Sequence, residues 1–453
     1  MPGAHMIDSV IFGHQWATTK SRAVFSEQQR MQRWVAILAA LARAQANLGI
    51  IPESAAEEID TLVGRELPLE LVAEHTRATS HSTLGLIRVL QSMLSEAARD
   101  HIYVGATVQD VTDTSMVIEM SEIGSLIWAD LRAIEHALCE LADTHATTPL
   151  VGRTHGQPGA PITFGFKAAS WAEEVGRSIE RLDEIRDRIL VCQLGGAVGS
   201  LGFFGEKALE LRSAFAHELG LGEPDISWLT ARDRVAEFAS VLAMATTGLA
   251  RMANEVFSLQ RAEIGELREA ANDAVVGSIT MPHKRNPESS EQVVVLARLV
   301  RSRAATLVDT MLQEHERDAR GWKAEWAVFP ELCNYASAAT AMVRTLVGGL
   351  EVDAEQMLVN LAKGRPESEI LLVLLTPHLG KHRAQDLLHE TYRSVATDGD
   401  LVAELRKRLP TEIADIDIPA GRSPQTGASA EMVASVIAAS RARRLGEPDS
   451  WGG

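Results

Sequence analysis

The stretch that decides the fold is residues 235–259, VAEFASVLAMATTGLARMANEVFSL. Its apolar side chains recur at alternating steps of three and four, beginning at Val235 and Phe238 and ending at Val256 and Leu259. This spacing places them on one seam of a helix about seven turns long. One helix cannot bury such a seam alone, so the pattern predicts long helices packed into a bundle, covered by neighbouring helices or by other subunits.

Proline placement extends the prediction along the chain. Proline removes a backbone donor and clashes with the preceding helical turn, so proline-free intervals can hold long helices. Such intervals lie between residues 68 and 149, 161 and 224, 224 and 282, and 287 and 330, and residues 293–307 carry a second apolar seam. We therefore expect a mostly α-helical protein with a central long-helix bundle. The tail from Arg441 to Gly453 is expected to fray.

Composition narrows the class of protein. The 453 residues include 44 Lys and Arg against 61 Asp and Glu, a formal charge of −17. An acidic chain without a clustered basic tract argues against binding to nucleic acid or to an anionic membrane. Cys139, Cys192 and Cys333 form no CxxC pair, which favours a reducing compartment. With neither a signal-like start nor an apolar membrane span, we expect a soluble cytoplasmic protein.

Three stretches rich in glycine, proline or threonine interrupt the helical intervals. They are residues 101–114, HIYVGATVQDVTDT; residues 152–165, GRTHGQPGAPITFG; and residues 277–287, GSITMPHKRNP. Each concentrates small residues and one or two candidate catalytic groups, and loops at the ends of a rigid scaffold commonly carry chemistry. The chain contains no HExxH, no GxxxxGK[ST] and no paired-carboxylate metal motif. We therefore expect no metal and no cofactor.

The third stretch closely resembles the GSxxMPxKxNP signature of the fumarase/aspartase superfamily. The other two stretches are similar to the remaining signature regions of that superfamily, in the same order along the chain. The resemblance begins at residues 25–52 and reaches the C-terminal helical region. It implies anti β-elimination from a substituted succinate, usually releasing fumarate through an aci-carboxylate intermediate.

The resemblance also implies roles for individual residues. Ser278 is the catalytic base, and its alkoxide requires an electropositive loop that closes over the substrate. His155 is the second catalytic residue, as a general acid or as part of a carboxylate-binding pair with Thr154. Lys284 and Asn286 stabilise the negative charge that develops on the intermediate. The remaining residues expected to bind substrate are Thr107, Gln109, Arg153, His81 and Met281, whereas Asp110 and Asp113 are expected to be structural.

Two subgroups share the MPHKRNP form, the adenylosuccinate lyases and the 3-carboxy-cis,cis-muconate cycloisomerases. Residues 105–110, 192–199 and 314–326 resemble the cycloisomerases, yet His155 stands where those enzymes often carry tryptophan. Trp326 stands where adenylosuccinate lyases carry a phosphate-binding arginine, and one indole N–H cannot replace it. We therefore expect a smaller substituted succinate, with nitrosuccinate as the sharpest hypothesis and the cycloisomerase reaction as the alternative. Adenylosuccinate, or a structural protein without catalysis, is less favoured.

The superfamily resemblance finally implies an architecture. It predicts an all-α fold of three helical domains, at residues 1–111, 112–351 and 352–453, with the long-helix bundle in the second. It also predicts a homotetramer whose active sites combine loops of three subunits around a small dicarboxylate substrate. The three motif stretches lie far apart in the sequence, which is compatible with shared sites.

Overall fold

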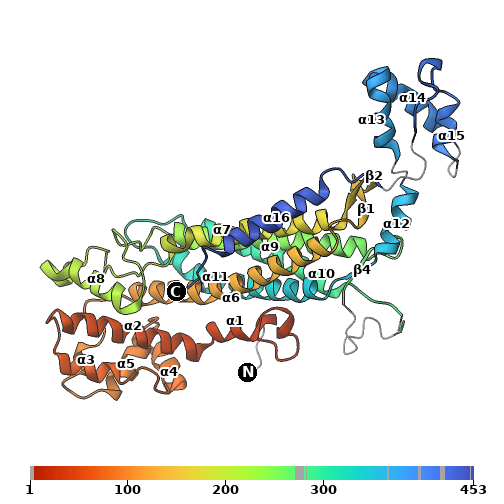
Figure 1. Ribbon diagram of the computed structural model, residues 1–453. Helices are drawn as coiled ribbons and strands as arrows, with labels where there is room; N and C mark the ends of the chain where they lie inside the picture. The colour runs from red at the N-terminus through yellow and green to blue at the C-terminus, as the bar shows by residue number, and fades with distance from the viewer. Residues whose placement is uncertain are drawn as a thin grey trace.

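The computed structural model describes residues 5–270, 280–281, 283–364, 367–395, 399–418, 424–448 and 450–452. Its long axis is formed by a bundle of parallel and antiparallel helices (Figure 1). The bundle helices are α6 (Val108–Thr144), α7 (Phe164–Ile189), α9 (Asp233–Leu259), α10 (Glu288–Asp309) and α11 (Ala319–Gly348).

The bundle confirms the apolar seams seen in the sequence. Every seam position of α9 from Val235 to Leu259 is buried, and Val293, Leu296, Val300 and Leu307 of α10 are fully buried. These side chains belong to one core that also includes the inner faces of α6, α7 and α11. The expected all-α class with a central long-helix bundle is therefore confirmed within the described residues.

Helix α11 continues through Pro330, although proline would ordinarily end a helix there. The side chain of Asn334 donates from Nδ2 to the Pro330 carbonyl at 2.9 Å. Phe329 and Leu332 on either side of the proline are buried in the bundle core. Packing on both sides of Pro330 thus holds the helix together where the local preference would break it.

The N-terminal region packs a second core against one end of the bundle (Figure 1). Its helices are α1 (Thr19–Val24), α2 (Glu27–Asn47), α3 (Glu53–Asp60), α4 (Leu69–Thr79) and α5 (Leu84–Met93), with α8 (Ala208–Leu219) packed on α2. Arg33 of α2 joins this region to the bundle by ion pairs with Glu119 and Glu122 of α6.

Two small antiparallel sheets lie at the opposite end of the bundle. Strands β1 (Pro149–Thr154) and β2 (Gln157–Thr163) form a hairpin, and β3 (Leu267–Arg268) pairs with β4 (Glu351–Val352). The sequence alone favoured a loop at residues 152–165, and this was wrong. Leu150 and Val151 are both buried there, and Leu150 belongs to the bundle core, so burial of apolar side chains holds β1 at the bundle end.

The C-terminal region contains α12 (Ala354–Lys363), α13 (Glu367–Leu379), α14 (Lys381–Ser394), α15 (Leu401–Arg406) and α16 (Ser429–Arg444). Helices α13, α14 and α15 share a small core of their own and project beyond the bundle (Figure 1). Helix α16 instead returns to α6 and α7, where Val433 and Ile437 pack on Ala142, Ala168 and Ala169. The division into three domains stays a prediction.

The expectation of a frayed tail was wrong for its described residues. Trp451 is fully buried, and its indole Nε1 donates to the Leu182 carbonyl at 2.7 Å. Arg443 donates to the buried carboxylate of Glu135 at 2.6 Å. The described residues of the tail are ordered because burial of the Trp451 ring and the Arg443 ion pair stabilise them against the bundle.

None of the helices in the described ranges combines the length and the apolarity that crossing a membrane requires.

Candidate active site

Arg317 joins the starts of two bundle helices. It lies just before α11 and donates from Nη1 to Thr107 Oγ1 at 2.6 Å and from Nε to Gln109 Oε1 at 3.2 Å. Gln109 is fully buried, and its Nε2 donates to the Leu229 carbonyl at 2.7 Å. Both ends of the Gln109 amide are therefore used within the protein, and its direct contact with substrate stays a prediction.

The charge of Arg317 is not neutralised by the groups it contacts. Thr107 and Gln109 are uncharged, and in the described part of the chain no carboxylate forms an ion pair with Arg317. A half-buried guanidinium held in place by neutral acceptors is suited to receive an incoming carboxylate. We call Thr107, Gln109 and Arg317 the arginine cluster.

Asp110 holds the backbone around this cluster. Its carboxylate accepts hydrogen bonds from the backbone N–H groups of Thr107 at 2.9 Å, Gly195 at 2.8 Å and Gly196 at 3.0 Å. Burial raises the pKa of Asp110 to about 6, although these three donors oppose the shift. Asp110 is therefore structural, as expected from the sequence, and ties the glycine-rich loop to the start of α6.

His81 lies near the same end of the bundle. The Nδ1 atom of His81 accepts from the backbone N–H groups of Thr83 at 3.4 Å and Leu84 at 3.2 Å, at the start of α5. Tyr103 connects this segment to the arginine cluster, because both Thr83 and Arg317 are close enough to lower its pKa. Burial outweighs them and raises the pKa of Tyr103 to about 12.

His155 occupies the turn of the β1–β2 hairpin. Its φ is 54°, and Thr154 pairs with Gln157 directly beside the turn. Both His155 and Thr154 are exposed. Arg153 anchors the hairpin by donating to both oxygens of the buried Glu266 carboxylate, at 2.8 and 2.6 Å. The Arg153 guanidinium is thus engaged inside the chain, and its contact with substrate stays a prediction.

The KRNP segment joins α9 to α10 at this hairpin end. Lys284 is exposed, its backbone N–H donates to the Met281 carbonyl at 3.0 Å, and Met281 is 43% exposed. Arg285 fixes the segment by donating to both oxygens of Glu351, at 3.2 and 2.9 Å. Asn286 is half-buried just before α10. Ser278, the expected base, lies outside the described residues.

These groups fall at opposite ends of the bundle. The arginine cluster marks the start of α6, and the His155 hairpin follows its end (Figure 1). Helix α6 has 37 residues, so at 1.5 Å a residue the two ends are about 55 Å apart. One chain therefore brings His155, Lys284 and Asn286 to one end, and Thr107, Gln109 and His81 to the other.

Backbone strain marks the same segments. Five non-glycine residues in the described ranges have positive φ, and they are Ser80, Tyr103, His155, Leu201 and His315. Four of them lie within four residues of Thr107, His81, His155 or Arg317. Such conformations cost free energy and concentrate where function over-determines the backbone.

The sequence reasoning did not single out two arginines, Arg317 and Arg232, that the structure places at or near the candidate site. Arg317 stands in the stretch 314–326, whose resemblance to the cycloisomerases was its only signal. Arg232 is fully buried between Asp113 and Glu325, which it joins at 2.7 and 2.9 Å. This ion triad links α6, α9 and α11 beneath the arginine cluster, in agreement with a structural role for Asp113.

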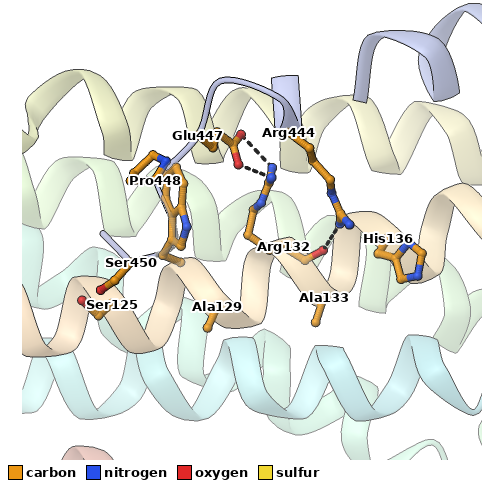
Figure 2. A pocket seen from close by; sticks show the side chains of 10 residues that line it. Ser125, Ala129, Arg132, Ala133, His136, Arg444, Glu447, Pro448 and Ser450 are labelled. Carbon is orange, nitrogen blue, oxygen red and sulfur yellow. Dashed lines mark hydrogen bonds and ion pairs between the residues drawn. The ribbon is translucent and has the colours of Figure 1, made fainter. Parts of the chain in front are cut away.

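One hollow of the surface lies away from every predicted site residue. It has a volume of about 590 Å³, on the outer face of α6 beside the C-terminal tail (Figure 2). Arg132 there donates to Glu447 at 2.7 Å, and Arg444 donates to the Arg132 carbonyl at 2.9 Å. These contacts hold the tail. No group of three or more potential metal ligands was found across the described positions.

Proteins of similar sequence indicate the family. The sequence profile of a lyase family matches residues 14–301. An N-acetyl-S-(2-succino)cysteine lyase from Enterococcus italicus is 36% identical over 392 residues, which cover 86% of each chain. A 3-carboxy-cis,cis-muconate cycloisomerase from Pseudomonas aeruginosa is 38% identical over 390 residues, covering 84% of this chain and 85% of that protein.

The fold comparison leads to the same enzymes. The crystal structure of 3-carboxy-cis,cis-muconate lactonizing enzyme from Pseudomonas putida superimposes with a TM-score of 0.85 at 34% identity. The alignment covers 95% of this chain and 99% of that structure. With the profile match, the relatives and the long-helix bundle in agreement, the chain belongs to the lyase family of the fumarase/aspartase superfamily.

Proposed function

We propose that the protein is a lyase that releases fumarate from a small succinate carrying a thioether substituent at C2. The observation that carries the proposal is Arg317, a guanidinium held by Thr107 and Gln109 without a carboxylate partner among the described residues. Such a group binds one carboxylate of a dicarboxylate substrate. The two N-acetyl-S-(2-succino)cysteine lyases at 36% and 38% identity support a sulfur substituent.

The proposed reaction breaks a C–H bond and a C–S bond, and it forms the O–H bond of Ser278 and a carbon–carbon double bond. Ser278 takes the proton α to one carboxylate, and the C–H electron pair enters the aci-carboxylate intermediate. As that pair forms the carbon–carbon double bond, the C–S pair departs with sulfur, leaving fumarate and a thiolate. A cysteine thiol has a pKa of about 8.5, so the leaving group needs only modest help from an acid, which His155 supplies.

Lys284 and Asn286 stabilise the intermediate in this proposal. Removing a proton next to a carboxylate builds a second negative charge, and fixed donors are needed where that charge develops. The cation of Lys284 lies in an exposed segment that Arg285 and Glu351 hold against the bundle end. It is therefore accessible to substrate at the same end as His155.

A complete site under this proposal requires more than one chain. Arg317 and His155 are separated within a chain by the length of α6, about 55 Å. A four- or five-carbon dicarboxylate cannot span that distance. We propose that the protein is a homotetramer in which the arginine cluster of one subunit faces the hairpin and the KRNP segment of its neighbours.

Two other functions are candidates: elimination of nitrite from nitrosuccinate, and the cycloisomerase reaction. Nitrosuccinate stays a hypothesis, because nitrite is a good leaving group and the nitro group acidifies its own carbon, but no described residue recognises a nitro group. The cycloisomerase reaction, in which a muconate carboxylate adds across a double bond, is supported by the relative from Pseudomonas aeruginosa. His155 favours elimination over that reaction, because it stands where the cycloisomerases often carry tryptophan.

A single fumarate-release assay separates these candidates. Purified protein receives N-acetyl-S-(2-succino)cysteine, nitrosuccinate, aspartate, argininosuccinate, adenylosuccinate and 3-carboxymuconate in parallel, with Ser278→Ala as the control. We expect fumarate from the thioether, abolished in the variant. If only nitrosuccinate released fumarate, the leaving group would be nitrite and not a thiol. Consumption of the muconate without release of fumarate would establish the cycloisomerase reaction. No turnover of any compound would favour a structural protein.

A further inference from the structure

His155 stands in the two-residue turn of the β1–β2 hairpin in a strained conformation. His155 and Gly156 have φ of 54° and 74°, and Thr154 pairs with Gln157 on either side of them. Positive φ at both central residues is typical of a tight hairpin turn of type I′, and it is unfavourable for a residue with a side chain. His155 therefore needs contacts from outside the turn to hold its position.

The strand pairing beside this turn is irregular. Pro158 is paired with Arg153 and Pro161 with Val151, and a proline has no N–H to donate to the neighbouring strand. The register also shifts between Val151 and Arg153, which interrupts the ladder. Backbone pairing alone therefore gives this end of the hairpin less support than a regular antiparallel ladder would give.

A buried ion pair supports the hairpin instead. Arg153 donates from Nη1 to Glu266 Oε2 at 2.8 Å and from Nη2 to Glu266 Oε1 at 2.6 Å. The Glu266 side chain is fully buried, and that of Arg153 is 20% exposed. Two hydrogen bonds between a guanidinium and a carboxylate fix orientation as well as distance. Because Arg153 is two residues before His155, this pair fixes the strand that leads into the turn.

Glu266 is itself held by its backbone and by its side chain. Its N–H donates to the Leu259 carbonyl at the end of α9 at 2.9 Å, and its carbonyl accepts from the Asp353 N–H at 3.0 Å. Asn360 of α12 donates from Nδ2 to Glu266 Oε1 and to the Ile264 carbonyl, both at 2.8 Å. The carboxylate is therefore a fixed point between the bundle and α12.

This arrangement distinguishes Arg153 from Arg317. A substrate carboxylate could pair with Arg153 only by displacing Glu266, which would leave a buried carboxylate without its cation. Such an uncompensated buried charge is strongly unfavourable. Arg317, in contrast, contacts the neutral side chains of Thr107 and Gln109. The geometry therefore suits Arg317 to binding a substrate carboxylate and Arg153 to holding the hairpin.

We propose that Glu266 and Arg153 are positioning residues that hold His155 where it protonates the departing group, and that neither of them touches the substrate. Glu266 fixes the guanidinium of Arg153, Arg153 fixes the end of β1, and the turn presents the imidazole. The inference rests on the proposed function, because it concerns the acid of that reaction.

The first test compares two thioether succinates whose leaving thiols differ in acidity. The thiolate released from (nitrophenylthio)succinate needs little protonation, whereas (ethylthio)succinate releases a weakly acidic thiol that depends on an acid. We expect Glu266→Gln to lower kcat on the ethyl compound by about 10- to 100-fold and on the nitrophenyl compound by less than about 3-fold. His155→Ala should show the same dependence on the leaving group, and KM should change by less than about 3-fold in Glu266→Gln.

Two further variants complete this test. Glu263→Gln makes the same change at an exposed carboxylate three residues earlier and should alter neither rate. Arg153→Lys, which can contact one carboxylate oxygen, should lose less kcat on the ethyl compound than Arg153→Ala. An equal loss of kcat on both compounds in Glu266→Gln would overturn the proposal. A KM at least about 10-fold higher for both compounds in Arg153→Lys would also overturn it, because Arg153 would then bind the substrate.

The second test does not depend on catalysis. Amide hydrogen exchange, followed by mass spectrometry of the intact protein, reports on the hairpin at residues 149–163. We expect Glu266→Gln to speed exchange there at least about 10-fold without changing exchange in the middle of α9, and Glu263→Gln to match the wild type. This result in a protein that releases fumarate from no succinate would retain the anchoring role and reject the proposed reaction. Unchanged exchange in the hairpin, or faster exchange throughout the chain, would reject the positioning role.

Discussion

Arg317 donates to Thr107 at 2.6 Å across 210 residues of sequence, and this bond joins the start of α11 to the start of α6. The same guanidinium reaches Gln109, whose amide is fixed by the Leu229 carbonyl. Three segments that are distant in the chain thereby present one positive charge at one end of the bundle. The relationship defines the part of the proposed active site that would bind one substrate carboxylate.

We expect Arg317→Ala to lower kcat/KM by about 100-fold for the succinate that proves to be the substrate. The reason is the loss of a charge-assisted contact with one substrate carboxylate, which contributes about 1.5–3 kcal/mol. Steady-state kinetics measures the effect. Lys323→Ala removes an exposed cation of the same helix and serves as the control. Equal activity in the two variants would show that Arg317 does not bind substrate.

Mixing two inactive variants tests whether sites are shared between subunits. Arg317→Ala and His155→Ala alter opposite ends of α6, so subunits reassembled from both should form some intact sites and regain activity. Arg317→Ala and Thr107→Ala alter the same end, so their mixture should regain none. Activity is compared before and after denaturation and reassembly. Recovery in neither mixture, with reassembly verified, would contradict shared sites; Ser278→Ala with His155→Ala provides a further pair.

The tail residue Trp451 should contribute to global stability. Its ring is fully buried against Gly124, Phe238 and the Leu182 carbonyl, and Trp→Ala changes in cores cost about 3–5 kcal/mol. We expect Trp451→Ala to lower the denaturant midpoint markedly at constant protein concentration. Leu445→Ala, which removes a side chain that is 91% exposed, should leave the midpoint unchanged. A tail that frays would give the same midpoint for both variants.

Glu119 should make stability depend on pH near neutrality. Burial raises the pKa of this carboxyl to about 7 from an ordinary 4.5, against the opposing charges of Arg33 and Arg30. A raised carboxyl pKa means that the folded state binds the proton more tightly, so stability is retained below pH 4.5 and is lost as the pH rises through 7. Relative to Glu119→Gln, the wild type should lose up to about 3 kcal/mol between pH 4 and 8.

Unfolding by denaturant at several pH values measures this difference. Glu122→Gln removes the neighbouring carboxylate, which is 36% exposed, and should keep the pH dependence of the wild type. Parallel curves for the wild type and Glu119→Gln would show that Glu119 keeps one protonation state through the range.

Local patterns predicted the parts of the protein that depend on nearby residues. The seam of α9 follows from spacing alone, because a helix places every third or fourth residue on one face whatever surrounds it. Asp110 could be identified as structural because it lies three residues after Thr107, where a carboxylate can cap the start of a helix. The motif stretches were likewise readable because their glycines and prolines stand at fixed local spacing.

Other features of the fold could not be predicted from short stretches of sequence. Helix α11 passes Pro330 because Phe329 and Leu332 pack on both sides of it, and the strand that contains Leu150 was hidden by the glycines around it. The anchoring of Trp451 between α6 and α7 depends on a surface that residues 121–182 create. In each case tertiary packing outweighed a local preference.

The sequence by itself determined the long-helix bundle, the superfamily and the residue types of the proposed site, since these depend on periodicity and on short motifs. Only the tertiary structure decided where those residues lie. It placed Arg317 on Thr107 and left His155 about 55 Å away, because the length and direction of α6 set that separation. It also joined Arg153 to Glu266, because these residues meet only when the hairpin packs beside the end of α9.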